Sequence, residues 1–407
     1  MKDIQYLAIE GLSRPIALID CRELIDHFPL IFRGWQITEV PESTEPPILT
    51  LRHEKTTYIV EASLLNKPLL RKDKVAAICG LVAELVRAYV NDDANLLCMH
   101  GAAADFGGKL VIFPNKYRAG KSILSACLVE AGIRLFCDDA LPISMAEGHG
   151  IAMGLAPCLR FPLPDNLNPE SRRFIEANAA LKGRQYFYLD LKESGLAAHG
   201  SHAPVGAFVL LEREEGVTPV LEAIAESEVL RQVVWQNFAR EAEAPQILER
   251  LSQMVGSAQR YRLRYDRTED AVALLKQTFK DWPETGEENS LAPLLSDHGG
   301  SELVEIPPGC YMRQADISVV KVDGEGFLAD VQGAAIHHLN PVGSAIWTLL
   351  AEPMTLNEMV ELLLVAFPEA SRDQVESDVD TLIKSLMSRK LLIAGPQPDE
   401  VKQSTAG

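Results

Sequence analysis

A short apolar segment followed by a loop that ends in Gly120-Lys121-Ser122 constrains the fold of this 407-residue chain more than any other feature. Residues 109–113 are predicted to form a strand, and residues 123–130 a helix. In a phosphate-binding loop with this setting, backbone N–H groups and the N-terminus of the helix surround the phosphates. Lys121 is then expected to reach the β- and γ-phosphate oxygens, and Ser122 to bind Mg²⁺. An ordinary helix start is the alternative explanation.

The loop departs in one place from the full pattern G-x-x-x-x-G-K-[S/T], which would place a glycine at position 115. Asparagine, which stands there instead, is among the non-glycine residues that tolerate a positive φ angle, so the turn can still form. A loop that binds nucleotide without turnover stays open. The predicted nucleotide-binding residues are Asn115, Arg118, Ala119, Gly120, Lys121 and Ser122.

A pair of carboxylates follows the loop. Residues 133–137 are predicted to form a strand that ends in Asp138 and Asp139. Two carboxylates at the end of a strand beside a phosphate loop suit one Mg²⁺ ligand and one base that accepts the proton of an attacking hydroxyl. Both are predicted catalytic residues, and Asp139 with Ser122 is assigned to the metal, although the pattern does not separate the two roles. A turn-forming Asp pair is the alternative.

Hydrophobic patterning predicts the elements around these motifs. Between residues 96 and 145 it alternates strand, helix and strand, which favours a parallel sheet. A segment rich in Pro, Gly, Ser and acidic residues, 282–301, is predicted as a linker. The other predicted strands before the linker are 6–9, 16–19, 48–52, 57–60, 185–189 and 207–211, and the predicted helices are 74–90, stretches within 227–255, and 270–279.

The motifs follow one another in a set order. His100-Gly101 comes first, then the strand, Ala-Gly-Lys-Ser, the helix, and a segment from Gly132 to Asp139. This order resembles the HPr serine kinase family. Three later segments, 155–162, 207–213 and 261–266, also look like the HPr-kinase-related proteins of biosynthetic gene clusters.

The resemblance covers about residues 90–280 and implies an α/β P-loop kinase core that uses ATP and Mg²⁺. In the family the Asp pair and the His surround the phosphoryl group. The resemblance therefore implies catalytic roles for His100, Asp138 and Asp139, and a weaker substrate role for Arg160. A lone His is otherwise more often structural. The family commonly has glycines where this chain has Asn115 and Arg118.

A second group of motifs lies in the C-terminal part. Predicted strands at 310–313, 317–322, 327–330 and 335–339 precede three helices, which start near Pro341, Thr355 and Ser371. The motifs Leu339-Asn340-x-x-Gly343-x-Ala345-Ile346-Trp347, Asp378-Val379-Asp380 and Leu391-Leu392-Ile393 resemble the PqqD family. That α+β winged-helix fold is the peptide-recognition element of pathways for ribosomally made, post-translationally modified peptides.

The PqqD resemblance implies that a leader peptide adds as a strand beside residues 335–339 and rests against the helix at 371–389. The alternative is that these apolar positions only form the core. A DNA-binding role is disfavoured, because residues 303–395 hold 6 basic and 13 acidic side chains, a net charge of −7. The implied peptide-binding residues are Ile336, His337, His338, Val375 and Val379.

Composition excludes several other classes of protein. The net charge of −18 argues against a protein that coats nucleic acid or anionic lipid, and no apolar run approaches the ~20 residues that span a bilayer. The seven cysteines form no C-x-x-C pair, so we expect free, mostly buried thiols rather than a zinc site or a disulfide framework. The N-terminus lacks the pattern of a signal peptide, which favours a cytoplasmic protein. A homo-oligomer stays open.

The predicted organisation is a strand-rich N-terminal region (1–90), a kinase-like core (91–281), a linker (282–301), a PqqD-like domain (302–396) and a disordered tail (397–407). The favoured function is an ATP-dependent kinase that binds a precursor peptide and phosphorylates a hydroxyl side chain, of Ser above all. One alternative is a non-catalytic precursor-peptide chaperone with a degenerate nucleotide site. Another is phosphorylation of a small carrier protein. The phosphoryl donor, ATP or another, stays open.

Overall fold

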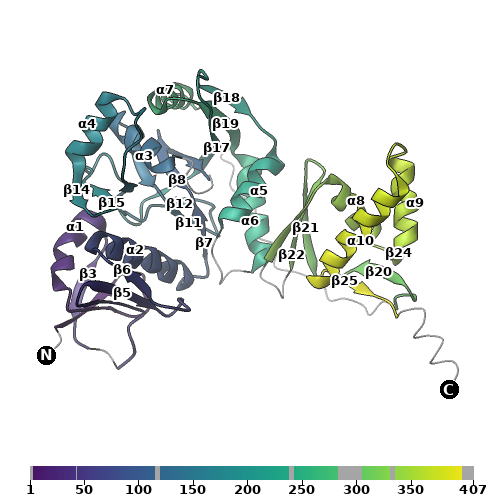
Figure 1. Ribbon diagram of the computed structural model, residues 1–407, viewed down its shortest axis with the longest axis horizontal. Helices are drawn as coiled ribbons and strands as arrows, with labels where there is room; N and C mark the ends of the chain where they lie inside the picture. The colour runs from purple at the N-terminus through teal and green to yellow at the C-terminus, as the bar shows by residue number, and fades with distance from the viewer. Residues whose placement is uncertain are drawn as a thin grey trace. The chain divides into compact units, whose positions relative to one another are not determined.

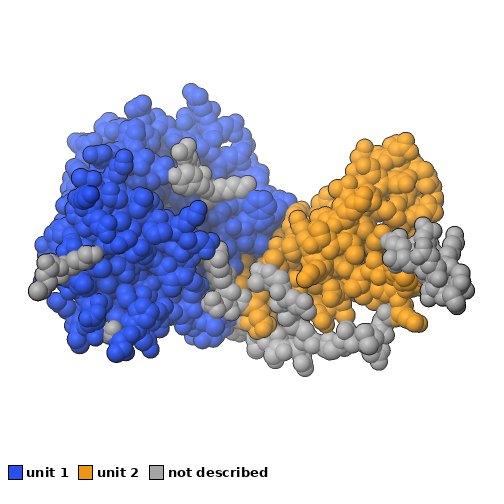
Figure 2. All heavy atoms as spheres, turned by 60° about the horizontal axis from the view of Figure 1, so that its bottom comes forward, with its two compact units in different colours: residues 1–242, 253–293 blue, residues 243–252, 294–407 orange. Residues whose placement is uncertain are grey.

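The computed structural model describes residues 3–42, 44–114, 120–237, 243–282, 305–330 and 335–396. The chain divides into two compact units, one of residues 1–242 and 253–293 and the other of residues 243–252 and 294–407, coloured separately in Figure 2. Most of the predicted linker and all of the predicted tail lie outside the described residues. Among the described residues, no helix combines the length and apolar character that a membrane crossing requires.

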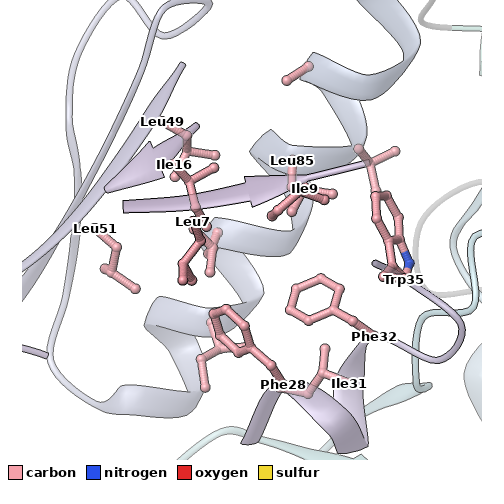
Figure 3. Close-up of a cluster of buried hydrophobic side chains, with 14 of the residues drawn as sticks. Leu7, Ile9, Ile16, Phe28, Ile31, Phe32, Trp35, Leu49, Leu51 and Leu85 are labelled. Carbon is pink, nitrogen blue, oxygen red and sulfur yellow. The ribbon is translucent and has the colours of Figure 1, made fainter. Parts of the chain in front are cut away.

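The first unit begins with a six-stranded sheet in the order β3-β1-β2-β4-β5-β6. Helix α2 (Lys74–Asn91) packs on this sheet, and its N-cap Asp73 accepts a hydrogen bond from the Ala76 N–H at 3.0 Å. Figure 3 shows apolar side chains of the sheet, of α1 and of α2, among them Leu85, pointing into a shared core. The elements are β1 (Ile4–Ile9), β2 (Ile16–Ile19), η1 (Arg22–His27), α1 (Phe28–Ile31), β3 (Ile37–Val40), β4 (Leu49–Glu54), β5 (Thr57–Ala62) and β6 (Leu69–Arg71).

The strands predicted before residue 75 and the helix predicted at 74–90 are present. Strands β3 and β6 were not predicted. They form the two edges of the sheet, and none of their residues is buried. The regular apolar alternation that identifies a half-buried strand is therefore missing from both.

The second six-stranded sheet of this unit carries the Gly-Lys-Ser helix, and its order is β10-β8-β9-β17-β19-β18. The expectation of a parallel sheet between residues 96 and 145 is wrong in part. Strand β8 lies between β9 and β10 and runs antiparallel to both. Strand β17 lies between β9 and β19 and runs parallel to both. The elements are β8 (Ala102–Phe106), β9 (Lys109–Phe113), α3 (Lys121–Glu130), β10 (Arg134–Cys137), β17 (Val205–Arg213), β18 (Val220–Ala223), β19 (Gln259–Tyr265) and α7 (Thr268–Thr278) (Figure 1).

A tight turn explains the inserted strand. Gly107 and Gly108 both have positive φ angles, of 68° and 94°, and Asp105 Oδ1 accepts a hydrogen bond from the Gly108 N–H at 2.7 Å. Two glycines of this conformation connect β8 and β9 as a hairpin, which favours antiparallel neighbours. The helix crossover from β9 to β10 therefore passes over β8.

Two smaller sheets complete the first unit, in the orders β16-β12-β11-β7 and β13-β15-β14. Three of their strands position predicted site residues: His100 ends β7, Asp139 directly precedes β11, and Arg160 ends β13. The remaining elements are β7 (Leu96–His100), β11 (Ala140–Ser144), β12 (Gly150–Ile151), β13 (Cys158–Arg160), α4 (Pro169–Asn178), β14 (Ala179–Lys182), β15 (Tyr186–Leu189), β16 (His202–Ala203) and α5 (Glu226–Gln236). Helix α6 (Ala244–Ser257) is divided between the units, since residues 244–252 belong to the second unit and residues 253–257 to the first.

The C-terminal unit contains the predicted strands followed by three helices. The predicted capping box of α9 is present, since Thr355 and Glu358 exchange side-chain and backbone hydrogen bonds. Trp347 and Val379, each 1% exposed, lie in the core, and burial of a side chain such as Val379 contributes about 1.5–3 kcal/mol. The elements are β20 (Cys310–Arg313), β21 (Ile317–Val322), β22 (Glu325–Asp330), β23 (Ala335–Leu339), α8 (Pro341–Leu349), β24 (Met354–Thr355), α9 (Leu356–Ala366), α10 (Arg372–Ser388) and β25 (Leu392–Ala394).

Candidate functional site

The candidate site of the first unit starts at the N-terminus of α3. Gly120 is the N-cap residue, with a left-handed backbone (φ 87°) that favours glycine. Lys121 and Ser122 are the first two residues of the helix; Lys121 is buried and Ser122 half-buried. The predicted loop residues Asn115, Arg118 and Ala119 lie outside the described residues. The N-terminal N–H groups of α3 have no carbonyl partners inside the helix, which is the condition for anion binding there.

Strand pairing brings His100 to Asp139. Strands β7 and β11 run antiparallel with Ala140 opposite His100, and the Gly101 N–H donates to the Asp139 carbonyl oxygen at 2.9 Å. The His100 Nδ1 atom lies 3.3 Å from Asp139 Oδ1. Burial lowers the pKa of His100 and nearby Lys121 lowers it further, against the opposing effect of Asp139. His100 therefore lies in contact with the Asp139 carboxylate, in surroundings that disfavour the charged form of its imidazole.

Asp138 has a different environment from its neighbour. It is buried, and its Oδ2 atom accepts a hydrogen bond from the Cys158 N–H at 3.1 Å. Burial, followed by the charge of Asp139, raises the pKa of Asp138 from 3.8 to about 7, although the Cys158 hydrogen bond opposes this shift. A carboxyl group with a pKa near neutrality suits proton transfer at physiological pH.

Lys121 shares the electrostatic environment of the two carboxyl groups. Burial lowers its pKa, and the charges of Asp139 and then Asp138 act in the opposite direction. The side chain therefore brings a cation to the carboxylate pair at the start of α3. Such an arrangement can neutralise charge on a phosphoryl group that reacts beside it.

Arg160 lies at the end of β13, two residues after the backbone N–H that contacts Asp138. Its guanidinium donates to the Tyr186 hydroxyl at 2.9 Å and lies 5.2 Å from the centre of the Tyr186 ring. Strand pairing sets this contact, because Arg160 stands opposite Tyr186 on β15. The structure thus places Arg160 on the strand that supports Asp138.

The residues fit Mg²⁺ as part of a shared site rather than as a complete protein cage. Among the described residues, no group of three or more His, Cys, Asp or Glu side chains could hold a metal ion. Mg²⁺ is usually held by one or two carboxylates together with substrate phosphates, and it prefers hard oxygen donors. Asp139, whose side chain is 72% exposed, and the Ser122 hydroxyl provide donors of this type.

A pocket that the sequence patterns did not indicate lies next to Arg160. It has a volume of about 290 Å³, and Phe161, Phe187 and Ile175 contribute apolar walls. Oppositely charged side chains line it as well, Asp165 and Glu176 against Arg172 and Lys182. Its walls come from α4, β14, β15 and the segment after β13, which only the tertiary fold brings together.

The C-terminal unit offers a strand edge in place of a charged site. In the described residues β23 pairs with β22 alone, and it forms one edge of the sheet β21-β22-β23. His337 Nδ1 lies 3.1 Å from an Nη atom of Arg389, which follows α10. His338 contacts Glu325 of the neighbouring strand.

The predicted peptide-binding residues divide into two groups. Ile336, His337 and His338 lie on the edge strand and are half-buried. Val375 and Val379 lie on α10 and are only 9% and 1% exposed, so they belong to the core of the unit. Within the described part of the chain, the backbone edge of β23 has no strand partner on one side, so this edge, rather than the two valines, is the candidate contact for another chain.

A match to a known protein family lies in the C-terminal unit. Residues 325–392 match the family model of the Coenzyme PQQ synthesis protein D (PqqD). This segment is PqqD-like. It includes β22, β23 and the three helices α8, α9 and α10, and all five predicted peptide-binding residues lie inside it.

The comparison of the whole chain with solved structures gives a weaker likeness. A solved structure of the Hpr(Ser) kinase/phosphatase from Coxiella burnetii aligns with 44% of this chain and 91% of that chain, at 13% sequence identity and a TM-score of 0.23. A likeness at this TM-score carries no argument about fold or activity. A search of curated proteins found no match.

Proposed function

We propose that this protein is an ATP-dependent kinase that binds a ribosomally made precursor peptide through its PqqD-like segment and phosphorylates a hydroxyl side chain, most readily that of Ser. The observation that carries the proposal is the convergence of Lys121, His100, Asp138 and Asp139 at the start of α3. These four residues come from three separate places in the chain: the start of α3, the end of β7, and the two-residue connection between β10 and β11. The order of their motifs resembles the HPr serine kinase family.

The proposed reaction is an in-line transfer of the γ-phosphoryl group of ATP. Lys121 and the N-terminal amides of α3 hold the triphosphate, while Ser122 and Asp139 would hold Mg²⁺, which neutralises phosphate charge when bound. Asp138 accepts the proton as the substrate hydroxyl oxygen bonds to the γ-phosphorus. The bond from phosphorus to the β–γ bridging oxygen breaks, and ADP leaves. His100 keeps Asp139 oriented through the 3.3 Å contact.

Peptide capture is proposed to occur by β-augmentation. A leader peptide would pair with the open edge of β23, and main-chain hydrogen bonds would supply affinity. The PqqD match to residues 325–392 supports this mode. Capture on the same chain raises the effective concentration of the substrate hydroxyl at the kinase site, often to the millimolar range for flexible links.

The decisive experiment combines the purified chain, ATP, Mg²⁺ and a peptide encoded by a small open reading frame beside its gene. We expect the peptide to gain a phosphoryl group, detected by mass spectrometry, and Lys121→Ala to abolish this gain. Lys276→Ala is the matched control. The Lys276 ammonium donates a hydrogen bond to the carbonyl oxygen of Ala131, which is the C-cap residue of α3 and so lies at the opposite end of the helix from the site. Unchanged phosphorylation in Lys121→Ala would reject the mechanism.

A second candidate function is a peptide chaperone without catalysis. The observation in its favour is Asn115, which replaces the first glycine of the phosphate-loop pattern. Titration with ATP, in the presence and absence of Mg²⁺, separates the two functions. Peptide binding without any nucleotide binding would leave only the chaperone, and transfer to a folded carrier protein but not to a peptide would favour a carrier kinase.

A further inference from the structure

Two cysteines from distant parts of the first unit lie in direct contact beside the proposed catalytic base. Cys79 of α2 and Cys158 of β13 have their sulfur atoms 3.4 Å apart, although they are 79 residues apart in the sequence. A disulfide bond requires about 2.05 Å between sulfurs. The contact needs an approach of only about 1.4 Å to close.

The two thiols differ from the other cysteines of the unit in exposure. Cys79 and Cys158 are half-buried, whereas Cys21, Cys98, Cys127 and Cys137 are buried. All seven cysteines are free thiols. Among the described cysteines of this unit, partial exposure and contact between sulfur atoms therefore coincide at this pair.

The surroundings give the two sulfurs different chemistry. The hydrogen bond from Cys158 lowers the pKa of Cys79, and the Tyr188 hydroxyl, which donates to Cys79 Sγ at 3.5 Å, acts in the same direction. The hydrogen bond with Cys79 and burial raise the pKa of Cys158. Because the Tyr188 hydroxyl donates to Cys79 alone, Cys79 is the more easily deprotonated of the two thiols, and the thiolate is the form that oxidants attack. Cys158, whose sulfur is in contact with it, stands as the resolving partner.

We propose that Cys79 and Cys158 form a redox modification site, in which a hydroperoxide converts the pair to a disulfide that disturbs the support of Asp138. The Cys79 thiol is first oxidised to a sulfenic acid as the peroxide O–O bond breaks and water leaves. Cys158 sulfur then attacks the sulfenic sulfur, and the hydroxyl group leaves with the Cys158 proton as a second water. Two thiols and one hydrogen peroxide thus give one disulfide and two waters.

The consequence for the site follows from the position of Cys158. The same residue whose sulfur would move toward Cys79 donates its backbone N–H to Asp138 at 3.1 Å. Residues 158 and 160 share one face of β13, so a shift of the strand also moves Arg160. The disulfide itself does not depend on the proposed function, whereas its effect on phosphoryl transfer rests on it.

The test treats the full chain with hydrogen peroxide under native conditions and maps cross-linked peptides by mass spectrometry. We expect a Cys79–Cys158 cross-link, a loss of two hydrogens from the intact mass, and full reversal by dithiothreitol. Cys79→Ser and Cys158→Ala should each prevent the cross-link. Cys310→Ser, which removes a half-buried thiol of the other unit, should leave it unchanged. Sulfinic acid at Cys79 without a cross-link, or no reaction at either thiol, would overturn the proposal.

A second readout measures the coupling to Asp138. The rate of peptide phosphorylation should fall about tenfold on oxidation, the effect of losing one hydrogen bond to a charged group, and recover with dithiothreitol. The Cys79→Ser variant should keep its rate under peroxide. A cross-link without a change in rate would overturn the regulatory part. Absence of phosphorylation in the reduced protein would reject the proposed function, while peptide mapping would still decide whether the disulfide forms.

Discussion

The two regions proposed to act on a substrate are built on opposite principles. The site at the start of α3 depends on ionisable side chains whose pKa values are shifted by burial, and Asp138 is the clearest case. The edge of β23 depends on backbone groups, and its nearby side chains His337 and His338 already have partners at Arg389 and Glu325. Phosphoryl transfer relies on charged groups that are shielded from water, whereas binding of a peptide by strand addition draws its affinity from main-chain hydrogen bonds at a strand edge.

This comparison also separates the effects of mutation. A single substitution at the start of α3 removes the proton acceptor or the cation that the proposed reaction requires. A side-chain substitution on β23 leaves the main-chain donors and acceptors in place. Catalysis should therefore be much more sensitive to point mutations than peptide binding, which is the feature the following predictions test.

The largest expected effect is that of Asp138→Asn on catalysis. The amide cannot accept the hydroxyl proton, so we expect the rate of peptide phosphorylation to fall about 10²–10⁴-fold. Peptide affinity, measured by fluorescence anisotropy, should stay the same. Asp105→Asn provides a control carboxyl on the same sheet, because Asp105 pairs with Arg134 beside the Gly107-Gly108 hairpin, at the other end of β8 from the strand end that leads into α3. A rate within twofold of the wild type would show that Asp138 is not the base.

The second prediction concerns stability against pH. Because burial raises the pKa of Asp138 to about 7, the folded chain keeps this proton at a higher pH than the unfolded chain does. The contribution to stability is complete below about pH 4 and is lost as the pH rises through about 7, by at most about 4 kcal/mol. Denaturant unfolding across this range should show a free energy of unfolding that falls with pH. Asp138→Asn should show a smaller fall, and equal slopes would contradict the assignment.

The third prediction addresses the edge of β23. In an antiparallel strand, N–H groups of successive residues face the partner strand and the open edge in turn. Of Ile336→Pro and His337→Pro, one should therefore weaken peptide binding about tenfold or more while keeping the thermal stability, and the other should destabilise the pairing with β22. ATP binding should be normal in both folded variants. Unchanged peptide affinity in both would exclude strand addition at this edge.

The smallest expected effect is at the contact between Arg389 and His337. Burial, and then the positive charge of Arg389, lower the pKa of His337, while Asp330 acts in the opposite direction. Arg389→Ala should raise this pKa, measured by NMR titration, and change peptide affinity by less than tenfold. Lys384→Ala is the control, because Lys384 pairs with Asp380 instead. A larger loss of affinity would mean that side chains, rather than the backbone edge, dominate recognition.

The two regions also differ in how far the sequence could predict them. Local signals identified Gly120 at the helix start and the capping box of Thr355 and Glu358, because each depends on neighbouring residues. The order of β8, β9 and β10 could not be read from a strand–helix–strand pattern, since the Gly107-Gly108 hairpin inserts β8.

Long-range convergence was the other limit. The contact of His100 with Asp139 agrees with the expectation that these residues share a site, but their catalytic roles remain predictions. The support of Asp138 by Cys158, and the contact of Cys158 with Cys79, join segments that no periodicity links. Val375 and Val379 show the reverse problem, because an apolar position on a helix has the same pattern in a core as in a groove.

The central claim is that one chain captures a peptide with its PqqD-like segment and phosphorylates it at the start of α3. The most direct measurement is the phosphorylation rate of one peptide with and without its leader, in the wild type and in Asp138→Asn. The account predicts rapid transfer to the full peptide by the wild type, slower transfer without the leader, and almost none in the variant. Equal rates with and without the leader, or equal rates in the two proteins, would contradict it.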